Sequence, residues 1–384
     1  MSSSQTVQLR GITWNHSRGY LPMVATAQRF METHLETQFV WEKRSLQEFA
    51  DCPLEKLTES FDLLVIDHPF VGTAARSGAL LPLDEHLSVE FLADQRQNSV
   101  GQSYHSYTYD KHQWALAIDA ATPVASWEPK LLEKSGASVP ESWEELLQLA
   151  KRGMVAFPAI SVDSLMNFFM LCCALGEEPC SQGDRVVEPA RGCNALEMLR
   201  ELTSLCSREI FGRNPIATYE VMAEREEIAY CPFAFGYSNY ARPGYARKSL
   251  RFGDLCRIGN KGRAQSTLGG TGLAVSAACK HRETALEYAR FVASPDCQRS
   301  LYVQSGGQPG HRQAWTDPDA NRLTSDYFRN TLPVLDRAYL RPRYPGYIDF
   351  QDRGGEIVHK YLKDGGKPEA VIEQLQQLYE RTHG

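Results

Sequence analysis

The stretch that decides the fold is Tyr104–Leu147, YHSYTYDKHQWALAIDAATPVASWEPKLLEKSGASVPESWEELL. Residues 113–118 form a short apolar run bounded by polar residues, which predicts a buried strand. A helix is predicted over 129–134. Gly136 and Pro140 then interrupt the backbone, and Ser142-Trp143-Glu144-Glu145 reads as a capping box that begins a second helix. This order of elements indicates a chain that crosses from one lobe to another.

Strands and helices alternate on both sides of this stretch. Strands are predicted over 7–12, 39–41 and 61–66 before it, and over 154–157 and 228–231 after it. Residues 61–66 are almost continuously apolar, which is typical of a parallel strand buried on both faces. Alternating strands and helices predict an α/β fold.

Length and composition exclude several classes of protein. With 384 residues the chain is long enough for two domains, and 42% hydrophobic and 23% charged residues are ordinary for a globular protein. A net charge of −6 argues against binding to nucleic acid, because a polyanion requires concentrated Lys and Arg. The sequence contains no run of about 18 apolar residues that would predict a membrane span. We expect a monomer without a membrane segment.

The cysteines and the N-terminal residues bear on the compartment. The ten cysteines are scattered without the regular spacing of a disulfide framework, which favours a reducing compartment. The first residues, MSSSQTVQLRGITW, have neither a basic segment nor an apolar core typical of a secretory signal. We therefore expect a cytoplasmic protein for the chain as it stands, and a periplasmic protein if a signal was removed.

No common catalytic signature is present in the sequence. It lacks Gly-x-Ser-x-Gly, His-Glu-x-x-His, a Walker-type loop and Gly-x-Gly-x-x-Gly after a strand. We therefore expect a binding protein without a cofactor or a metal rather than an enzyme. A cytosolic enzyme remains an alternative, because Asp67, His68 and Asp119 are residue types suited to general acid/base chemistry.

Four separated blocks of sequence resemble the extracellular solute-binding proteins of ABC transporters, specifically the carbohydrate-type family 1. The first is the Trp-Ala-Leu-Ala strand and the Gly…Pro…Ser-Trp-Glu-Glu-Leu segment within Tyr104–Leu147. The second is Gly78-Ala79-Leu80-Leu81-Pro82-Leu83-Asp84, the third begins at Gly269 with GGTGLAVSAACKHRETALEYARFVASPDCQRSLYVQSGGQPGHR, and the fourth is Tyr344-Pro345-Gly346-Tyr347. The blocks follow one another in the order typical of the family.

The resemblance implies a two-lobed periplasmic-binding-protein-like (type II) α/β fold with a ligand cleft. The first lobe is expected to comprise 1–119 and 268–311, and the second 120–267 and 312–384. Crossings near 119–123 and 266–271 are expected to form the hinge. In open α/β sheets, ligands gather at the carboxyl ends of strands, and a hinged protein can close over its ligand.

Candidate ligand-binding residues follow the predicted strands and crossings. Each has a structural alternative: Trp14 can belong to the core, Asp67 can cap a helix, and the glycines at 269–270 can serve a hinge that requires positive φ. Loops at strand ends carry binding sites disproportionately. The candidates are Trp14, Asn15, His16, Arg18, Asp67, His68, Asp119, Tyr237, Asn239, Tyr240, Gly270 and Thr271.

The predicted ligand is a small polar molecule, and the sequence leaves its charge open. Carboxylates suit sugar hydroxyls, and aromatic residues such as Tyr237 and Tyr240 suit stacking on a ring. His16, Arg18 and Arg242 point instead to a sugar acid or a related carboxylate, because a guanidinium matches that geometry. The expected role is binding for an ABC-type uptake system with permease subunits as partners, and the alternative is a cytosolic enzyme or ligand sensor.

Overall fold

The computed structural model describes residues 6–45, 54–225, 227–259 and 262–383. The chain divides into two compact units, each assembled from separated stretches. Unit 1 comprises Met1–Ala121, Gly269–Leu323 and Arg343–Pro345, and unit 2 comprises Thr122–Leu268, Thr324–Pro342 and Gly346–Gly384. The chain thus passes from one unit to the other after Ala121, Leu268, Leu323, Pro342 and Pro345.

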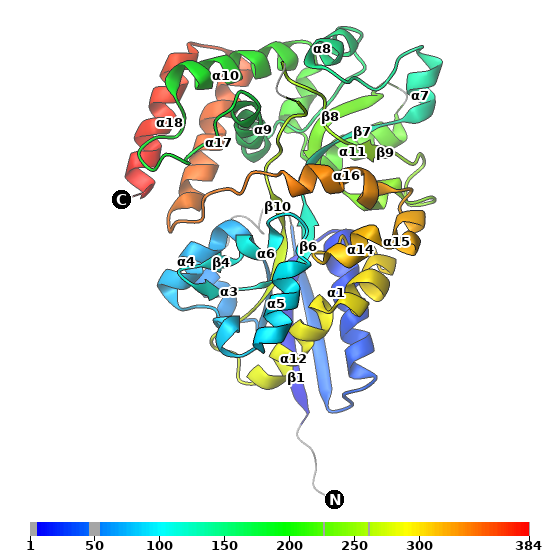
Figure 1. The fold of residues 1–384 in the computed structure, drawn as a ribbon, viewed down its shortest axis with the longest axis vertical. Coiled ribbons are helices and arrows are strands. Elements are labelled where there is room, and N and C mark those ends of the chain that lie inside the picture. Colours follow the sequence, from blue (N-terminus) through cyan, green and yellow to red (C-terminus); the bar gives the residue numbers. More distant parts are fainter. Residues whose placement is uncertain (1–5, 46–53, 226, 260–261, 384) are drawn as a thin grey trace, which may run out of the picture. The chain divides into compact units, whose positions relative to one another are not determined.

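Unit 1 contains a five-stranded mixed sheet in the order β2-β1-β3-β10-β6. Figure 1 labels β1, β6 and β10 of this sheet. β1 pairs in parallel with β2 and β3, whereas β10 pairs antiparallel with β3 and β6. The strands are β1 (Val7–Trp14), β2 (Thr37–Arg44), β3 (Leu63–Asp67), β6 (Leu116–Ala121) and β10 (Gly269–Val275). A strand from late in the chain therefore completes the sheet between two early ones.

Helices cover both faces of this sheet, as the apolar run of β3 requires. Leu63 and Val65 belong to one core cluster, and Leu64 and Ile66 belong to a second cluster. Side chains of α1 (Ser17–Met31) and α12 (Arg282–Ala293) complete the first cluster. Those of α3 (Leu54–Thr58) and α4 (Val71–Ser77) belong to the second. Because successive side chains of a strand point to opposite faces, the continuous apolar run is what a strand buried on both faces needs.

Unit 1 extends further along the chain than the predicted lobe, which ended at residue 311. Arg312 donates its backbone N–H to the Asn98 carbonyl at 2.7 Å, and the Trp315 indole donates to the Pro309 carbonyl at 2.7 Å. These bonds hold α14 (Arg312–Thr316) to unit 1, and α15 (Pro318–Leu323) follows it there. The other short elements of unit 1 are η1 (His68–Phe70), η2 (Leu83–Glu85), α5 (Val89–Gln97), α6 (Ser103–Ser106), β4 (Thr108–Tyr109), β5 (His112–Gln113), α13 (Pro295–Cys297) and η5 (Gln298–Tyr302).

Unit 2 combines a small antiparallel sheet with a group of long helices. The sheet has the order β8-β7-β9, formed by Pro123–Trp127 (β7), Tyr230–Phe235 (β8) and Arg251–Gly253 (β9). α9 (Ser161–Ala174), α10 (Pro189–Ser204), α17 (Tyr347–Asp364) and α18 (Pro368–His383) pack against one another (Figure 1). The remaining elements are α7 (Pro129–Lys134), α8 (Trp143–Lys151), η3 (Arg208–Gly212), α11 (Pro215–Glu224), η4 (Ser238–Ala241) and α16 (Tyr327–Asp336).

Three local predictions differ from the structure. The strand expected over 154–157 is reduced to one bridge between Val155 and Tyr230, and Pro158, which has no N–H to donate, follows at once. The strand expected over 7–12 is longer in the structure, because β1 continues to Trp14, and α1 already begins at Ser17. In the capping box, the Ser142 hydroxyl accepts the Glu145 N–H as expected, but the Glu145 carboxylate accepts the N–H of Glu141 rather than that of Ser142.

Within the described residues, none of the helices combines the length and the apolar character that crossing a membrane requires.

Candidate functional site

The carboxyl edge of the unit 1 sheet collects predicted site residues from four separate segments. Trp14 ends β1 and Asp67 ends β3, which are neighbouring parallel strands. Thr271 of the antiparallel β10 is paired on one side with Asp67 and on the other with Asp119 of β6. Residues that are distant in sequence therefore lie on adjacent strands, as expected for a binding site at the ends of parallel strands.

His16 is the N-cap of α1. Its Nδ1 accepts the backbone N–H of Arg18 at 2.9 Å, so the imidazole is a neutral acceptor at this nitrogen. Burial, and secondarily the charge of Arg18, lowers the pKa of His16 to about 3. The imidazole is thus uncharged at neutral pH and does not attract anions.

Arg18 and Asp119 form a buried ion pair in unit 1. The Arg18 Nε donates to one Asp119 carboxylate oxygen at 2.8 Å, and an Nη donates to the other oxygen. The two side chains are 4% and 0% exposed. Burial raises the pKa of Asp119, while the Arg18 guanidinium and the Thr271 backbone N–H act in the opposite direction. The fork of the guanidinium matches the two carboxylate oxygens, which is the strongest geometry for such a pair.

The Trp14 side chain is 4% exposed and belongs to the first core cluster of unit 1. The Arg18 guanidinium carbon lies 6.0 Å from the Trp14 ring centroid. A Cβ at Gly19 would lie 2.4 Å from this indole, so the first turn of α1 packs directly on it. Trp14 therefore positions the start of α1, and Asn15, which follows it, is exposed.

His68, Gly270 and Thr271 are held beside Asp67. His68 is 0% exposed, and its ring meets that of Tyr107 edge-on with 6.3 Å between centroids. Gly270 has φ +99°, and a Cβ there would lie 2.3 Å from the Asp119 carbonyl oxygen, so only glycine fits. Thr271 is 6% exposed, and its hydroxyl oxygen makes no hydrogen bond within the described part of the chain.

The predicted residues of unit 2 lie in an aromatic cluster after β8. Tyr237 and Tyr240 are 5% and 0% exposed, and both rings pack against Tyr219, with centroids 6.3 and 5.2 Å away. The Tyr240 hydroxyl donates to the Glu220 carboxylate at 2.6 Å, and burial together with this carboxylate raises the pKa of Tyr240. Asn239 lies between them in η4 and is 2% exposed. Burial lowers the pKa of Arg242, the next residue after η4, to about 10.

One buried carboxylate of unit 2 was missed in the sequence. Asp163 is the third residue of α9 and is 4% exposed, and its Oδ2 makes no hydrogen bond within the described residues. Burial raises its pKa to about 8. The sequence signal was a single acidic residue at the start of the apolar helix Ser161–Ala174, which a helix N-terminus explains equally well.

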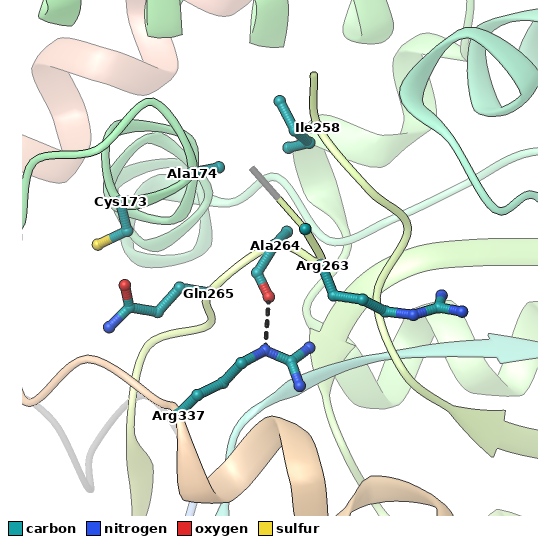
Figure 2. A pocket seen from close by; sticks show the side chains of 8 residues that line it. Cys173, Ala174, Ile258, Arg263, Ala264, Gln265 and Arg337 are labelled. Carbon is teal, nitrogen blue, oxygen red and sulfur yellow. Dashed lines mark hydrogen bonds between the residues drawn. The ribbon is translucent and has the colours of Figure 1, made fainter. Parts of the chain in front are cut away.

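Unit 2 contains a cavity of about 480 Å³ that is separate from the predicted site residues (Figure 2). It is lined by Cys173, Ala174, Ile258, Gly262, Arg263, Ala264, Gln265 and Arg337. Its polar groups already engage the protein: the Arg337 guanidinium donates to the Ala264 carbonyl at 3.0 Å and pairs with Asp254. Burial raises the pKa of the Cys173 thiol, so this thiol is a poor nucleophile. Among the described residues that line the cavity, none belongs to the predicted ligand-binding set. Across the described part of the chain, no group of three or more His, Cys, Asp or Glu is arranged to hold a metal ion.

Comparisons with known proteins place the fold in one class. No protein-family model matches the sequence. The structure is similar to the maltose-bound MalE3 of T. maritima, with a TM-score of 0.83 and 16% identity, covering 98% of this chain and 99% of that one. It is similar to a tagatose-bound ABC transporter solute-binding protein of Thermotoga lettingae, with a TM-score of 0.84 and 18% identity over 98% and 100% of the chains. A ribitol complex of an Agrobacterium radiobacter ABC transporter solute-binding protein gives a TM-score of 0.82 and 17% identity over 98% of both chains.

This similarity over nearly the whole chain confirms the predicted fold class. The protein has the two-lobed α/β fold of periplasmic binding proteins. At 16–18% identity, the similarity establishes the fold but not the ligand, which has to be inferred from the chemistry of the site.

Proposed function

We propose that this protein is a solute-binding protein of the carbohydrate-type family 1 that serves an ABC-type uptake system. The observation that carries the proposal is the similarity over 98% of the chain to solved structures whose ligands are maltose, tagatose and ribitol. These ligands share several neutral hydroxyl groups. The proposed ligand is therefore a small sugar or polyol, and the proposed partners are permease subunits.

The residue types at the unit 1 sheet edge support a ligand rich in hydroxyls. A carboxylate at Asp67 accepts two hydrogen bonds, and a threonine hydroxyl at Thr271 donates and accepts. The paired strands β3 and β10 hold these two residues in register. The rings of Tyr237 and Tyr240 are 5% and 0% exposed, so in this structure they offer almost no surface on which a sugar could stack.

The chain segments near 119–123 and 266–271 are the proposed hinge. Here β6 leads through Thr122 into β7, and Leu268 leads into β10. Ligand binding that favours one hinge conformation would produce a shape change that a permease can distinguish.

A thermal-shift screen of neutral sugars and polyols tests the proposal, with maltose, tagatose and ribitol included. A ligand at about 100 times its Kd stabilises the folded state by about 2.7 kcal/mol, which is readily measured. Asp67→Asn should weaken the best hit about tenfold or more, whereas Asp296→Asn, at a position whose side chain is 87% exposed, should leave binding unchanged. The proposal fails if no compound raises the melting temperature. Recovery of the hit unaltered, shown by mass spectrometry, distinguishes binding from turnover.

A further inference from the structure

The Arg18–Asp119 pair occupies a position that would otherwise attract anions. Arg18 is the second residue of the 15-residue helix α1, and the backbone N–H groups of a helix N-terminus already favour negative charge. A guanidinium at such a place is a common binding group for carboxylates. In this structure the bidentate partner of that guanidinium is the carboxylate of Asp119.

The pair adjoins residues proposed to bind the ligand. Asp119 accepts the backbone N–H of Thr271, and Thr271 is the residue that pairs with Asp67 across the neighbouring strand. On the other side, the guanidinium lies over the Trp14 ring at the end of β1. Both members are 4% exposed or less, so the charge of either one, left alone, would act through a medium that screens it weakly.

The charges at this edge of unit 1 then favour neutral ligands. His16 is uncharged at neutral pH because burial and Arg18 lower its pKa. The negative charge of Asp119 balances the positive charge of Arg18, and Asp67 adds a further carboxylate at the end of β3. A carboxylate ligand would find no unmatched cation among these residues and would meet a carboxylate instead.

We propose that Asp119 is a specificity-determining residue: it neutralises Arg18 and so makes the site select uncharged sugars and polyols against the corresponding sugar acids. This inference rests on the proposed function, and it assigns to Asp119 a role other than direct contact with the ligand. In this view Arg18 is an anion-binding group whose anion is the carboxylate of Asp119.

Two variants and matched ligand pairs test the inference. The pairs are a neutral sugar or polyol found in the thermal-shift screen and its carboxylate counterpart, such as ribitol with ribonate or glucose with glucuronate. Calorimetry on the wild type should give a Kd for the acid at least about tenfold weaker than that for the neutral member. Asp119→Asn leaves the positive charge of the guanidinium without its carboxylate partner and should shift the ratio of the two Kd values by about tenfold or more toward the acid. The double variant R18Q/D119N removes the cation as well and should restore the preference for the neutral ligand.

The Kd ratio separates specificity from simple structural damage. A variant that only disturbs the fold weakens both members of a pair alike, so the ratio stays at the wild-type value. The inference is overturned if Asp119→Asn leaves the ratio unchanged, or if the double variant favours the acid as strongly as the single variant. If the wild type binds no neutral sugar or polyol, the proposed function fails instead.

A second measurement decides the matter if Asp119→Asn does not fold. Asp119→Ala leaves space for a small carboxylate beside Arg18, so formate should raise its melting temperature in proportion to concentration, more than formamide does. R18Q/D119A should show no such difference. Equal effects of formate and formamide on the melting temperature of Asp119→Ala would overturn the claim that Arg18 is an anion-binding group occupied by Asp119. This result would count against the inference whatever ligand the protein binds.

Discussion

Replacing the buried Asp163 by asparagine should remove a large pH-dependent penalty on stability. The carboxyl is buried at the start of α9, and burial raises its pKa from 3.8 to about 8. Because the folded state holds this proton more tightly than the unfolded state, the penalty is absent below about pH 4, grows as the pH rises, and is complete above about pH 8. From 3.8 to 7 is about three pH units, so at about 1.4 kcal/mol per unit the wild type loses up to about 4 kcal/mol by pH 7 from this group.

Urea denaturation of wild type and Asp163→Asn at pH 5, 6, 7 and 8 measures this loss. The difference in the free energy of unfolding between the two proteins should move in favour of the variant by a few kcal/mol between pH 5 and pH 8, because asparagine does not ionise. Groups common to both proteins, including His311, whose pKa is lowered mainly by burial, cancel in this difference. Asp296→Asn, at a position whose side chain is 87% exposed, is the control and should follow the wild type at every pH. A difference for Asp163→Asn that is independent of pH would refute the reasoning.

Three smaller changes are each tied to one local contact. Gly270→Ala places a Cβ against a backbone oxygen at φ +99° and should cost about 1–3 kcal/mol, whereas Gly212→Ala, with nothing within 4 Å of its Cβ, should change stability by less than about 1 kcal/mol; chemical denaturation compares them. Ser142→Ala removes the N-cap acceptor of α8 and should cost about 1 kcal/mol, recovered by Ser142→Asp. Tyr240→Phe removes the bond to the Glu220 carboxylate and should cost about 1–3 kcal/mol at pH 7; an unchanged denaturation midpoint would show that this bond contributes nothing.

Much of the fold was predictable because it follows from local rules. The helix predicted over 129–134 has these bounds in the structure, since Pro129 suits a first turn and Gly136 provides the positive φ that ends the segment. The strand predicted over 61–66 forms over Leu63–Asp67, and residues 63–66 are buried on both faces, as their continuous apolar run requires. The strand predicted over 154–157 shows where local rules are insufficient. Its apolar and β-branched residues favour a strand, but within the described residues Val155 forms a single isolated bridge, to Tyr230.

The site was predictable only in outline, because its chemistry depends on pairings across long stretches of sequence. The ends of β1, β3 and β6 were predicted as candidate positions, and they lie in one sheet. That Arg18 binds Asp119, 101 residues away, is not visible in any local pattern, nor is the use of His16 as a helix cap. Two of the residues that suggested an acidic ligand therefore differ from what their side chains alone indicate: Arg18 is paired with Asp119, and His16 is an uncharged helix cap.

The short segment Arg343–Pro345 belongs to unit 1, although it lies near the C-terminal end of the sequence. The Arg343 guanidinium donates to the carbonyls of His105 and Thr108 at 2.6 and 2.7 Å, and a Cβ on Gly72 would lie 1.9 Å from the Arg343 carbonyl oxygen. Contacts that span more than 200 residues cannot form until nearly the whole chain has been synthesised. A nascent chain that stops at residue 121 therefore lacks both β10, which lies between β3 and β6 in the sheet, and this late segment. Unit 1 begins first, yet all of its residues are present only once the chain has been synthesised as far as residue 345. Truncating the chain before residue 343 therefore removes part of the N-terminal unit as well as the C-terminal helices.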